Sequence, residues 1–166
     1  MKYSFLPFLI LFTAVMTTSV QSQTPTYKQS DAPIDERVED LLSRMTVYEK
    51  IGQMTQLNIT TINTTGKQAD VELVEKKARD LIGDHHIGSF LNGEAVPPGR
   101  WYTFMNKLTR LAMEESRLDI PIIYGIDHVH GANYMEDATI FPHNINIGAT
   151  FNPAHAYNTG WVTAYE

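Results

Sequence analysis

The sequence contains no cysteine among its 166 residues. This absence excludes disulfide bonds, thiolate zinc sites, a cysteine nucleophile and a lipid-modified cysteine that could anchor the chain to a membrane. Basic residues are also few, since 13 Lys and Arg stand against 19 Asp and Glu, giving a formal net charge of −6. The basic residues are scattered rather than clustered. We therefore expect neither a nucleic-acid partner nor a lipid anchor.

The N-terminus has the pattern of a signal peptide. Lys2 is followed by the mostly apolar run Phe5 to Val15 and then by small and polar residues. The run is too short to span a bilayer, so residues 1–22 are predicted to be removed on export to the periplasm or the extracellular space. A buried N-terminal helix is the alternative. Removing 22 of the 166 residues leaves about 144, enough for one modest domain.

Residues 23–33 are rich in proline, serine, threonine and glutamine, and this composition predicts a flexible lead-in. An apolar residue recurs every three or four positions from Ile34 to Met45, which predicts an amphipathic helix. Thr46 and Glu49 then form a capping-box pattern, in which each side chain satisfies the other's backbone N–H. A second helix should therefore start directly after the first.

Helices and strands alternate in the rest of the chain. Short strands are predicted within residues 53–62, 87–91 and 120–126, and helices at 71–82 and 101–117. The nearly continuous apolar strand "IPIIYGI" is typical of a parallel sheet covered on both faces. The fold class is therefore predicted to be α/β with a parallel sheet.

Asp127 directly follows the last apolar strand. In barrels and in open parallel sheets, ligands bind at the carboxyl ends of the strands. An ionised aspartate there only accepts hydrogen bonds, and it can take two from adjacent hydroxyls of a sugar. The alternative is an aspartate that caps a turn into the following loop.

Three histidines follow in the same region. His128 and His130 are two residues apart, a spacing that some metal hydrolases use, and His143 or Asp137 could supply a third ligand. Because no second ligand pair supports such a site, the favoured interpretation is that the histidines orient a loop by hydrogen bonds. His143 follows Pro142, which stiffens a turn. It belongs either to a pocket wall or to the edge of a short strand.

Two further features carry alternatives of their own. Trp101 and Tyr102 could stack on a sugar, but core packing is favoured for both. Glu136 and Asp137 form a tempting acidic pair, which we interpret as loop surface.

The blocks "DLLSRMTVYEKIGQM", "IPIIYGIDHVHG" and "ATIFPHNINIGAT" resemble, in this order and at these separations, the opening of family 3 glycoside hydrolases. The resemblance spans approximately residues 35–166 and is strongest to the β-glucosidase and glucan exohydrolase branch. It implies a retaining enzyme that releases glucose from the non-reducing end of β-linked glucosides or oligosaccharides, with no cofactor and no metal. It also implies a (β/α)₈ TIM-type barrel followed by an α/β sandwich domain.

The resemblance also implies roles for single residues. Asp127 matches the family's aspartate that hydrogen-bonds hydroxyls of the glucose in the innermost subsite, and it is not the nucleophile. His130 and His143 match residues that shape the floor of that pocket. His128 departs from the family, which usually has a small residue at this position, so the rim of the subsite is expected to differ.

The barrel class needs about 250 residues, more than the mature piece contains. We therefore expect residues 34–166 to be the N-terminal part of an incomplete barrel, without the catalytic nucleophile and acid/base and inactive by itself. The rest of the barrel and the sandwich domain would be the missing partners. Two rival functions remain open, a secreted carbohydrate-binding fragment without chemistry and a metal-dependent barrel hydrolase using His128, His130 and His143. A preference for xylose over glucose also remains open.

Overall fold

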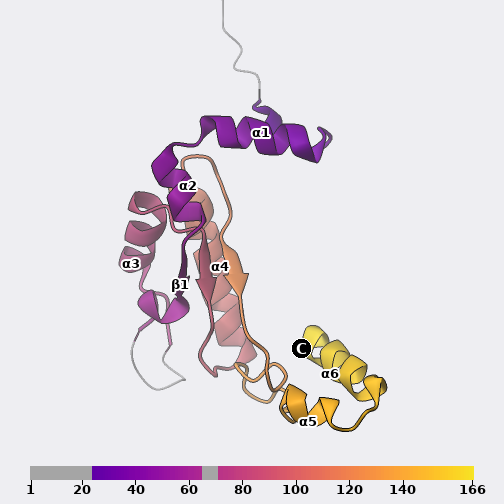
Figure 1. Ribbon diagram of the computed structural model, residues 1–166. Helices are drawn as coiled ribbons and strands as arrows, with labels where there is room; N and C mark the ends of the chain where they lie inside the picture. The colour runs from indigo at the N-terminus through magenta and orange to yellow at the C-terminus, as the bar shows by residue number, and fades with distance from the viewer. Residues whose placement is uncertain (1–23, 65–70) are drawn as a thin grey trace, which may run out of the picture. The chain divides into compact units, whose positions relative to one another are not determined.

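The computed structural model describes residues 24–64 and 71–166 (Figure 1). The predicted signal peptide, residues 1–22, lies outside the described residues. The chain divides into two compact units, Met1–Asp40 and Leu41–Glu166, which are described separately. Within the described residues, no helix is both long enough and apolar enough to cross a bilayer.

The first unit contains a short 3₁₀ helix η1 (Thr26–Lys28) and most of helix α1 (Ile34–Arg44). The Tyr27 backbone N–H donates to the Asp40 carboxylate at 3.0 Å, and Arg37 Nε donates to the Tyr27 carbonyl oxygen at 3.2 Å. The segment predicted as a flexible lead-in therefore carries a helical turn that is hydrogen-bonded to α1. The predicted helix near residues 34–45 is confirmed.

The second unit is built on three parallel strands, β1 (Gln56–Asn58), β2 (Ser89–Leu91) and β3 (Ile123–Gly125), in the order β1-β2-β3. Leu57 lies beside Phe90, and Phe90 lies beside Tyr124. The predicted parallel α/β architecture is confirmed to this extent. The strands are shorter than predicted, because the ladder hydrogen bonds extend over only three residues in each.

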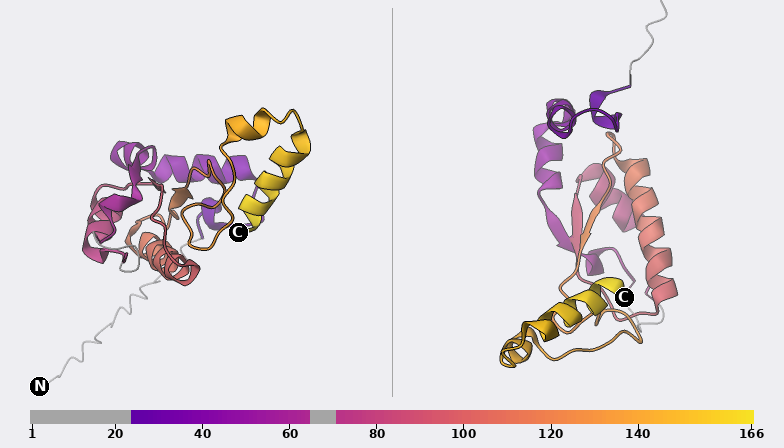
Figure 2. Two further views of the ribbon diagram at one scale, coloured as in Figure 1. Left: turned by 90° about the horizontal axis from the view of Figure 1, so that it is seen from below. Right: turned by 90° about the vertical axis from the view of Figure 1, so that its right-hand side faces the viewer.

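Helices connect the strands. A short turn η2 (Ile59–Thr61) follows β1, and helix α3 (Glu75–Arg79) continues into the π-helical turn η4 (Asp80–Asp84) before β2. The long helix α4 (Pro98–Glu115) joins β2 to β3, and helices α5 (Asn144–Gly148) and α6 (Pro153–Tyr165) come last. Figure 2 shows α3 and α4 on the same side of the sheet.

The core lies between the sheet and these two helices. Phe90 on β2 is fully buried, and Phe104 and Leu108 on α4 are at most 3% exposed. On the opposite face of β3, Ile123 is 69% exposed. Within the described residues the sheet is therefore covered on one face only, whereas the apolar β3 sequence had predicted cover on both.

An ion pair joins the buried Glu49 of α2 (Val47–Gln53) to Arg117, two residues after the end of α4. Glu49 is 6% exposed, and its carboxylate accepts hydrogen bonds from Arg117 Nε at 2.9 Å and Nη2 at 2.8 Å. The same carboxylate accepts from the Thr46 backbone N–H at 2.7 Å, which confirms the predicted capping box. Arg117 also donates to the Arg44 carbonyl oxygen at 2.9 Å. The Glu49–Arg117 pair thus connects the end of α1, the start of α2 and the segment after α4.

These contacts change the ionisation of Glu49. The hydrogen bonds from Arg117, helped by those from Thr46, lower the pKa of the Glu49 carboxyl from 4.5 to about 2, although burial acts in the opposite direction. The folded protein therefore holds this group in its charged form more strongly than the unfolded chain does.

We predict that Glu49→Gln lowers the free energy of unfolding by about 1–3 kcal/mol, because it removes the charge that accepts both hydrogen bonds from Arg117 and weakens the cap. The estimate is kept below the cost of a fully buried pair because the Arg117 side chain is 56% exposed. The measurement is urea denaturation at pH 7. Glu114→Gln is the control, since Glu114 is 51% exposed in its ion pairs and its loss should cost about 0.5 kcal/mol or less.

The stability difference between wild type and Glu49→Gln should also depend on pH. Since folding depresses the Glu49 pKa, the stabilisation is fully present above pH 4.5 and disappears as the pH falls towards about 2. The stability difference between wild type and Glu49→Gln should therefore shrink across this window. A difference that stays constant from pH 6 down to the folded-state pKa would contradict the assignment.

Candidate sugar-binding site

Asp127 lies two residues beyond the carboxyl end of β3. Side chains alternate along this segment: Tyr124 packs against Trp101 of α4, and Ile126 and His128 line a cavity next to α4. Asp127 does not line that cavity and is exposed. The alternation therefore places Asp127 on the open face of the sheet, the face to which Ile123 belongs.

The carboxylate of Asp127 is available for a ligand. Among residues 24–64 and 71–166, no group hydrogen-bonds or ion-pairs with it. The prediction that Asp127 stands at the carboxyl end of a parallel strand is therefore confirmed, and the alternative of a turn-capping aspartate finds no hydrogen bond to support it. Its role in binding stays a prediction.

The loop after Asp127 folds back on itself through His130. The Phe141 backbone N–H donates to the His130 carbonyl oxygen at 2.9 Å, and His130 Nδ1 lies 3.0 Å from the Phe141 carbonyl oxygen. A carbonyl oxygen only accepts, so Nδ1 carries the proton. In the neutral ring, His130 Nε2 is consequently an acceptor.

His143 has the opposite tautomer. It caps α5, and its Nδ1 accepts a hydrogen bond from the Ile145 backbone N–H at 3.2 Å. In the neutral ring the proton is therefore on Nε2, which is a donor. The rings of His130 and His143 meet edge to face with centroids 5.5 Å apart. Of the three histidines, the structure brings these two together, as one donor and one acceptor.

Gly131 makes this close folding of the loop feasible. Its φ is +86°, in the region that favours glycine. A methyl group on Gly131 would overlap the Thr139 carbonyl oxygen and lie 2.9 Å from Phe141 Cδ2. Residues 139–143 form no strand, so the alternative of a second short strand ending at Pro142 is wrong.

His128 belongs to a different surface. Its Nδ1 donates to the Gly131 carbonyl oxygen at 3.0 Å, and its ring lies beside Tyr134. Within the described part of the chain, no three histidine or acidic side chains are grouped so that they could hold a metal ion. The metal site considered for His128, His130 and His143 therefore has no support in the geometry.

A cavity of about 340 Å³ lies between α4, the loop after β3 and α6. Trp101 packs in its wall against Phe104 and Tyr124 and donates from Nε1 to the Tyr134 carbonyl oxygen at 3.1 Å. Burial raises the pKa of Tyr124 to about 12, and the neighbouring Tyr134 adds to the rise.

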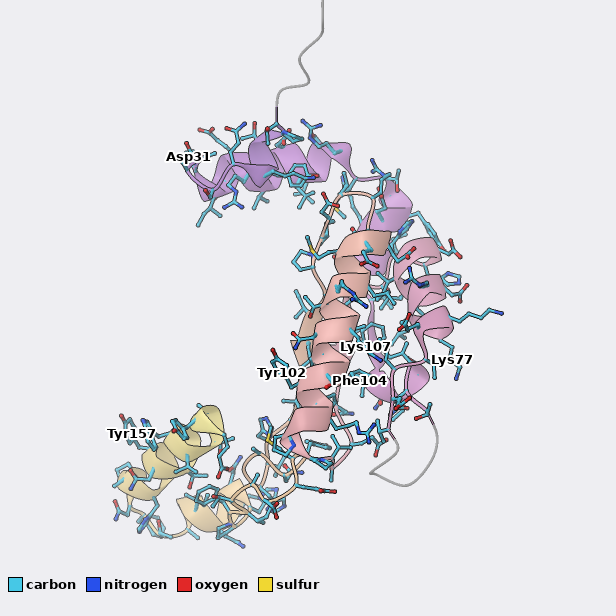
Figure 3. The ribbon with its side chains drawn as sticks, turned by 180° about the vertical axis from the view of Figure 1, so that it is seen from behind. Asp31, Lys77, Tyr102, Phe104, Lys107 and Tyr157 are labelled. Carbon is cyan, nitrogen blue, oxygen red and sulfur yellow. The ribbon has the colours of Figure 1, made fainter. Side chains whose placement is uncertain are left out.

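Core packing is confirmed for Trp101 but is wrong for its neighbour Tyr102. Figure 3 labels Tyr102 and Phe104 on α4, where Tyr102 is 73% exposed and Phe104 only 3%. Sequence reasoning missed Tyr134 and Met135 as cavity residues, because they carry no periodic pattern. Glu136 and Asp137 are exposed on the loop, as predicted.

Comparisons with known proteins match the region of the chain that contains Asp127. Residues 46–166 match the model of the glycosyl hydrolase family 3 N terminal domain. A lysosomal beta glucosidase of Dictyostelium discoideum is 37% identical over 142 residues, which cover 80% of this chain and 17% of that protein.

Two further relatives are named for different sugars. A periplasmic beta-glucosidase of Salmonella typhimurium is 30% identical over 132 residues, covering 80% of this chain and 14% of that protein. A putative beta-xylosidase of Formosa agariphila is 24% identical over 156 residues, covering 87% of this chain and 20% of that protein. The chain thus spans between 14% and 20% of the length of these three relatives.

We predict that Gly131→Ala destabilises the loop by about 1–3 kcal/mol, because it adds both backbone strain and an overlap with Thr139. Urea denaturation measures the loss, and proton NMR of the His130 and His143 rings reports whether their contact survives. Gly148→Ala is the matched control, since a methyl group there would meet nothing within 4 Å. Equal effects of the two substitutions would contradict the proposed role of Gly131.

Proposed function

The chain belongs to glycosyl hydrolase family 3, and from this premise we propose that it contributes the first part of a TIM-type barrel to an exported, retaining β-glucosidase-like enzyme. One observation carries the proposal. Asp127 stands unpaired among the described residues, beyond the carboxyl end of a parallel strand and on the open face of the sheet. Ligands of parallel α/β folds bind at this end of the strands.

The task of Asp127 in this proposal is to hold the sugar. Its ionised carboxylate accepts hydrogen bonds from two adjacent hydroxyls of the glucose in the innermost subsite, and such charge-assisted bonds are stronger than neutral ones. Two bonds to one planar group fix both the position and the orientation of the ring. The anomeric carbon is thereby presented to the nucleophile in a reactive geometry, which lowers the entropic part of the barrier.

Asp127 does not supply the chemistry. A retaining mechanism uses two carboxyl groups about 5 Å apart on either side of the glycosidic bond, one as nucleophile and one as acid/base. We propose that both come from parts of the enzyme outside these 166 residues. Glu136 and Asp137 are exposed on the loop and take no part.

His130 and His143 form the floor beside Asp127 in this proposal. The two backbone hydrogen bonds between His130 and Phe141 hold the loop closed, and the His143 cap fixes the start of α5. Because their tautomers are opposite, one ring offers an acceptor and the other a donor. A rigid floor of this kind keeps a bound sugar from moving away from Asp127.

The proposed substrates are β-linked glucosides and oligosaccharides, for which the names of two relatives give the support. The name of the Formosa relative keeps xylosides as an alternative sugar. Export is proposed on the pattern of residues 1–22 and on the periplasmic and lysosomal locations in those names. A second candidate function is sugar binding without hydrolysis, because Asp127 alone provides at most one of the two carboxyls that hydrolysis needs.

We predict that Asp127→Asn weakens the binding of methyl β-glucoside by this chain about 10- to 100-fold, because the charged acceptor is lost while the shape is kept. Ligand-observed NMR measures the dissociation constant. Asp137→Asn is the matched control, an exposed aspartate at φ +65° whose replacement by asparagine should leave binding unchanged.

An equal loss of affinity in both variants would contradict the site. The two candidate functions separate when the same substitutions are made in a protein that carries the whole family 3 region. Release of glucose that Asp127→Asn reduces supports the hydrolase, whereas binding without release supports the binding fragment.

A further inference from the structure

The open face of the sheet is more polar than an ordinary core face. The strand register aligns Gln56 with Ser89 and Ile123, and two residues further on it aligns Asn58 with Leu91 and Gly125. These residues alternate with Leu57, Phe90 and Tyr124, which face the helices. Gln56 and Asn58 are exposed, so the face that leads to Asp127 carries two carboxamides.

Gln56 reaches across this face towards β3. A methyl group placed on Gly125 would lie 3.8 Å from Gln56 Nε2 and 3.5 Å from Leu91 Cδ1. The Gln56 amide therefore lies beside Gly125, at ordinary contact distance from the position that a side chain there would take. Gly125 is two residues before Asp127 on the same face, which separates the two positions by about 7 Å along the strand.

The Gln56 amide is also the one glutamine amide of the described chain without a partner. Gln29 Nε2 donates to the Thr24 carbonyl oxygen at 2.8 Å, and Gln53 Nε2 donates to the His86 carbonyl oxygen at 3.2 Å. Among the described residues nothing hydrogen-bonds the carboxamide of Gln56. The Asn58 side chain is instead held at the start of η2, where its Oδ1 accepts from the Thr60 backbone N–H at 3.0 Å and from the Thr60 hydroxyl at 2.9 Å.

Asp127 and Gln56 are chemically complementary. An ionised aspartate has no hydrogen to donate, so a hydroxyl bound to it keeps lone pairs that need a donor. The nine residues of β1, β2 and β3 include no lysine, arginine or histidine, so a side-chain donor from these strands is neutral. The Gln56 amide, whose Nε2 lies beside Gly125, meets that need for a hydroxyl of the same sugar ring.

We propose that Gln56 is a second sugar-contacting residue of the Asp127 site. This inference rests on the proposed function, because it assigns a donor to the same bound sugar. In the bound state the Gln56 Nε2 hydrogens donate to a ring hydroxyl, while hydroxyls of the same ring donate to Asp127. Specificity follows, since a sugar without a hydroxyl towards Gln56 leaves that amide unpaired.

The test measures binding of methyl β-glucoside to this chain and to its variants by ligand-observed NMR. Gln56→Met keeps the length of the side chain but removes its hydrogen-bonding groups, and it should raise the dissociation constant about tenfold. Gln56→Glu keeps acceptors, removes the donors and adds a charge near Asp127, so it should weaken binding at least as much.

Controls separate this inference from the proposed function. Gln29→Met lies in the other unit and should leave affinity unchanged, and the melting temperature of every variant reports whether a loss is structural. If Asp127→Asn weakens binding and Gln56→Met at unchanged melting temperature does not, the role of Gln56 is refuted while the Asp127 site stands. If the wild-type chain shows no binding, the proposed function fails in this chain and the inference fails with it.

Discussion

The arrangement of the second unit depends on the ion pair between the buried Glu49 carboxylate and Arg117. Arg117 lies just past the end of α4, where the chain turns towards β3, and its bidentate bond to Glu49 fixes that exit against the start of α2. The direction in which the chain enters β3 decides which side chains face α4 and which face the open side. The position of Asp127 is thus set in part by a carboxylate 78 residues earlier, itself held by the Thr46 cap.

The two faces of the sheet carry different kinds of side chains. Aromatic side chains on the α4 side form a packed cluster around Trp101 and the adjoining cavity, whereas carboxamides and Asp127 occupy the open side. His128 and Asp127 are neighbours in sequence, yet alternation sends His128 to the cavity. This division explains why the dense run of polar residues after β3 does not converge on a metal ion and why Asp127 keeps an unpaired carboxylate among the described residues.

Much of this could be predicted where the signal is local. The capping box of Thr46 and Glu49 needs only three residues of spacing, and the helix near residues 34–45 needs only its apolar stripe, so both were found. The ends of the strands were not predicted correctly, because a ladder of hydrogen bonds forms only where neighbouring strands lie in register. The Glu49–Arg117 pair joins residues 68 apart, and the bond between His130 and Phe141 depends on Gly131 at positive φ. Contacts of this kind cannot be predicted from a local sequence pattern. The position of the Gln56 amide beside Gly125 likewise became visible only in the structure.

The central claim is that a sugar binds on the open face of the sheet and not in the aromatic cavity. The most direct measurement is a ¹⁵N-resolved NMR titration of this chain with methyl β-glucoside, following the Gln56 side-chain amide, the Asp127 backbone amide and the Trp101 indole N–H. The account predicts shifts at Gln56 and Asp127 and an unchanged Trp101 signal, because the indole N–H is bonded to the Tyr134 carbonyl oxygen on the other face. Shifts concentrated at Trp101 and Tyr102, with Gln56 and Asp127 unmoved, would contradict it.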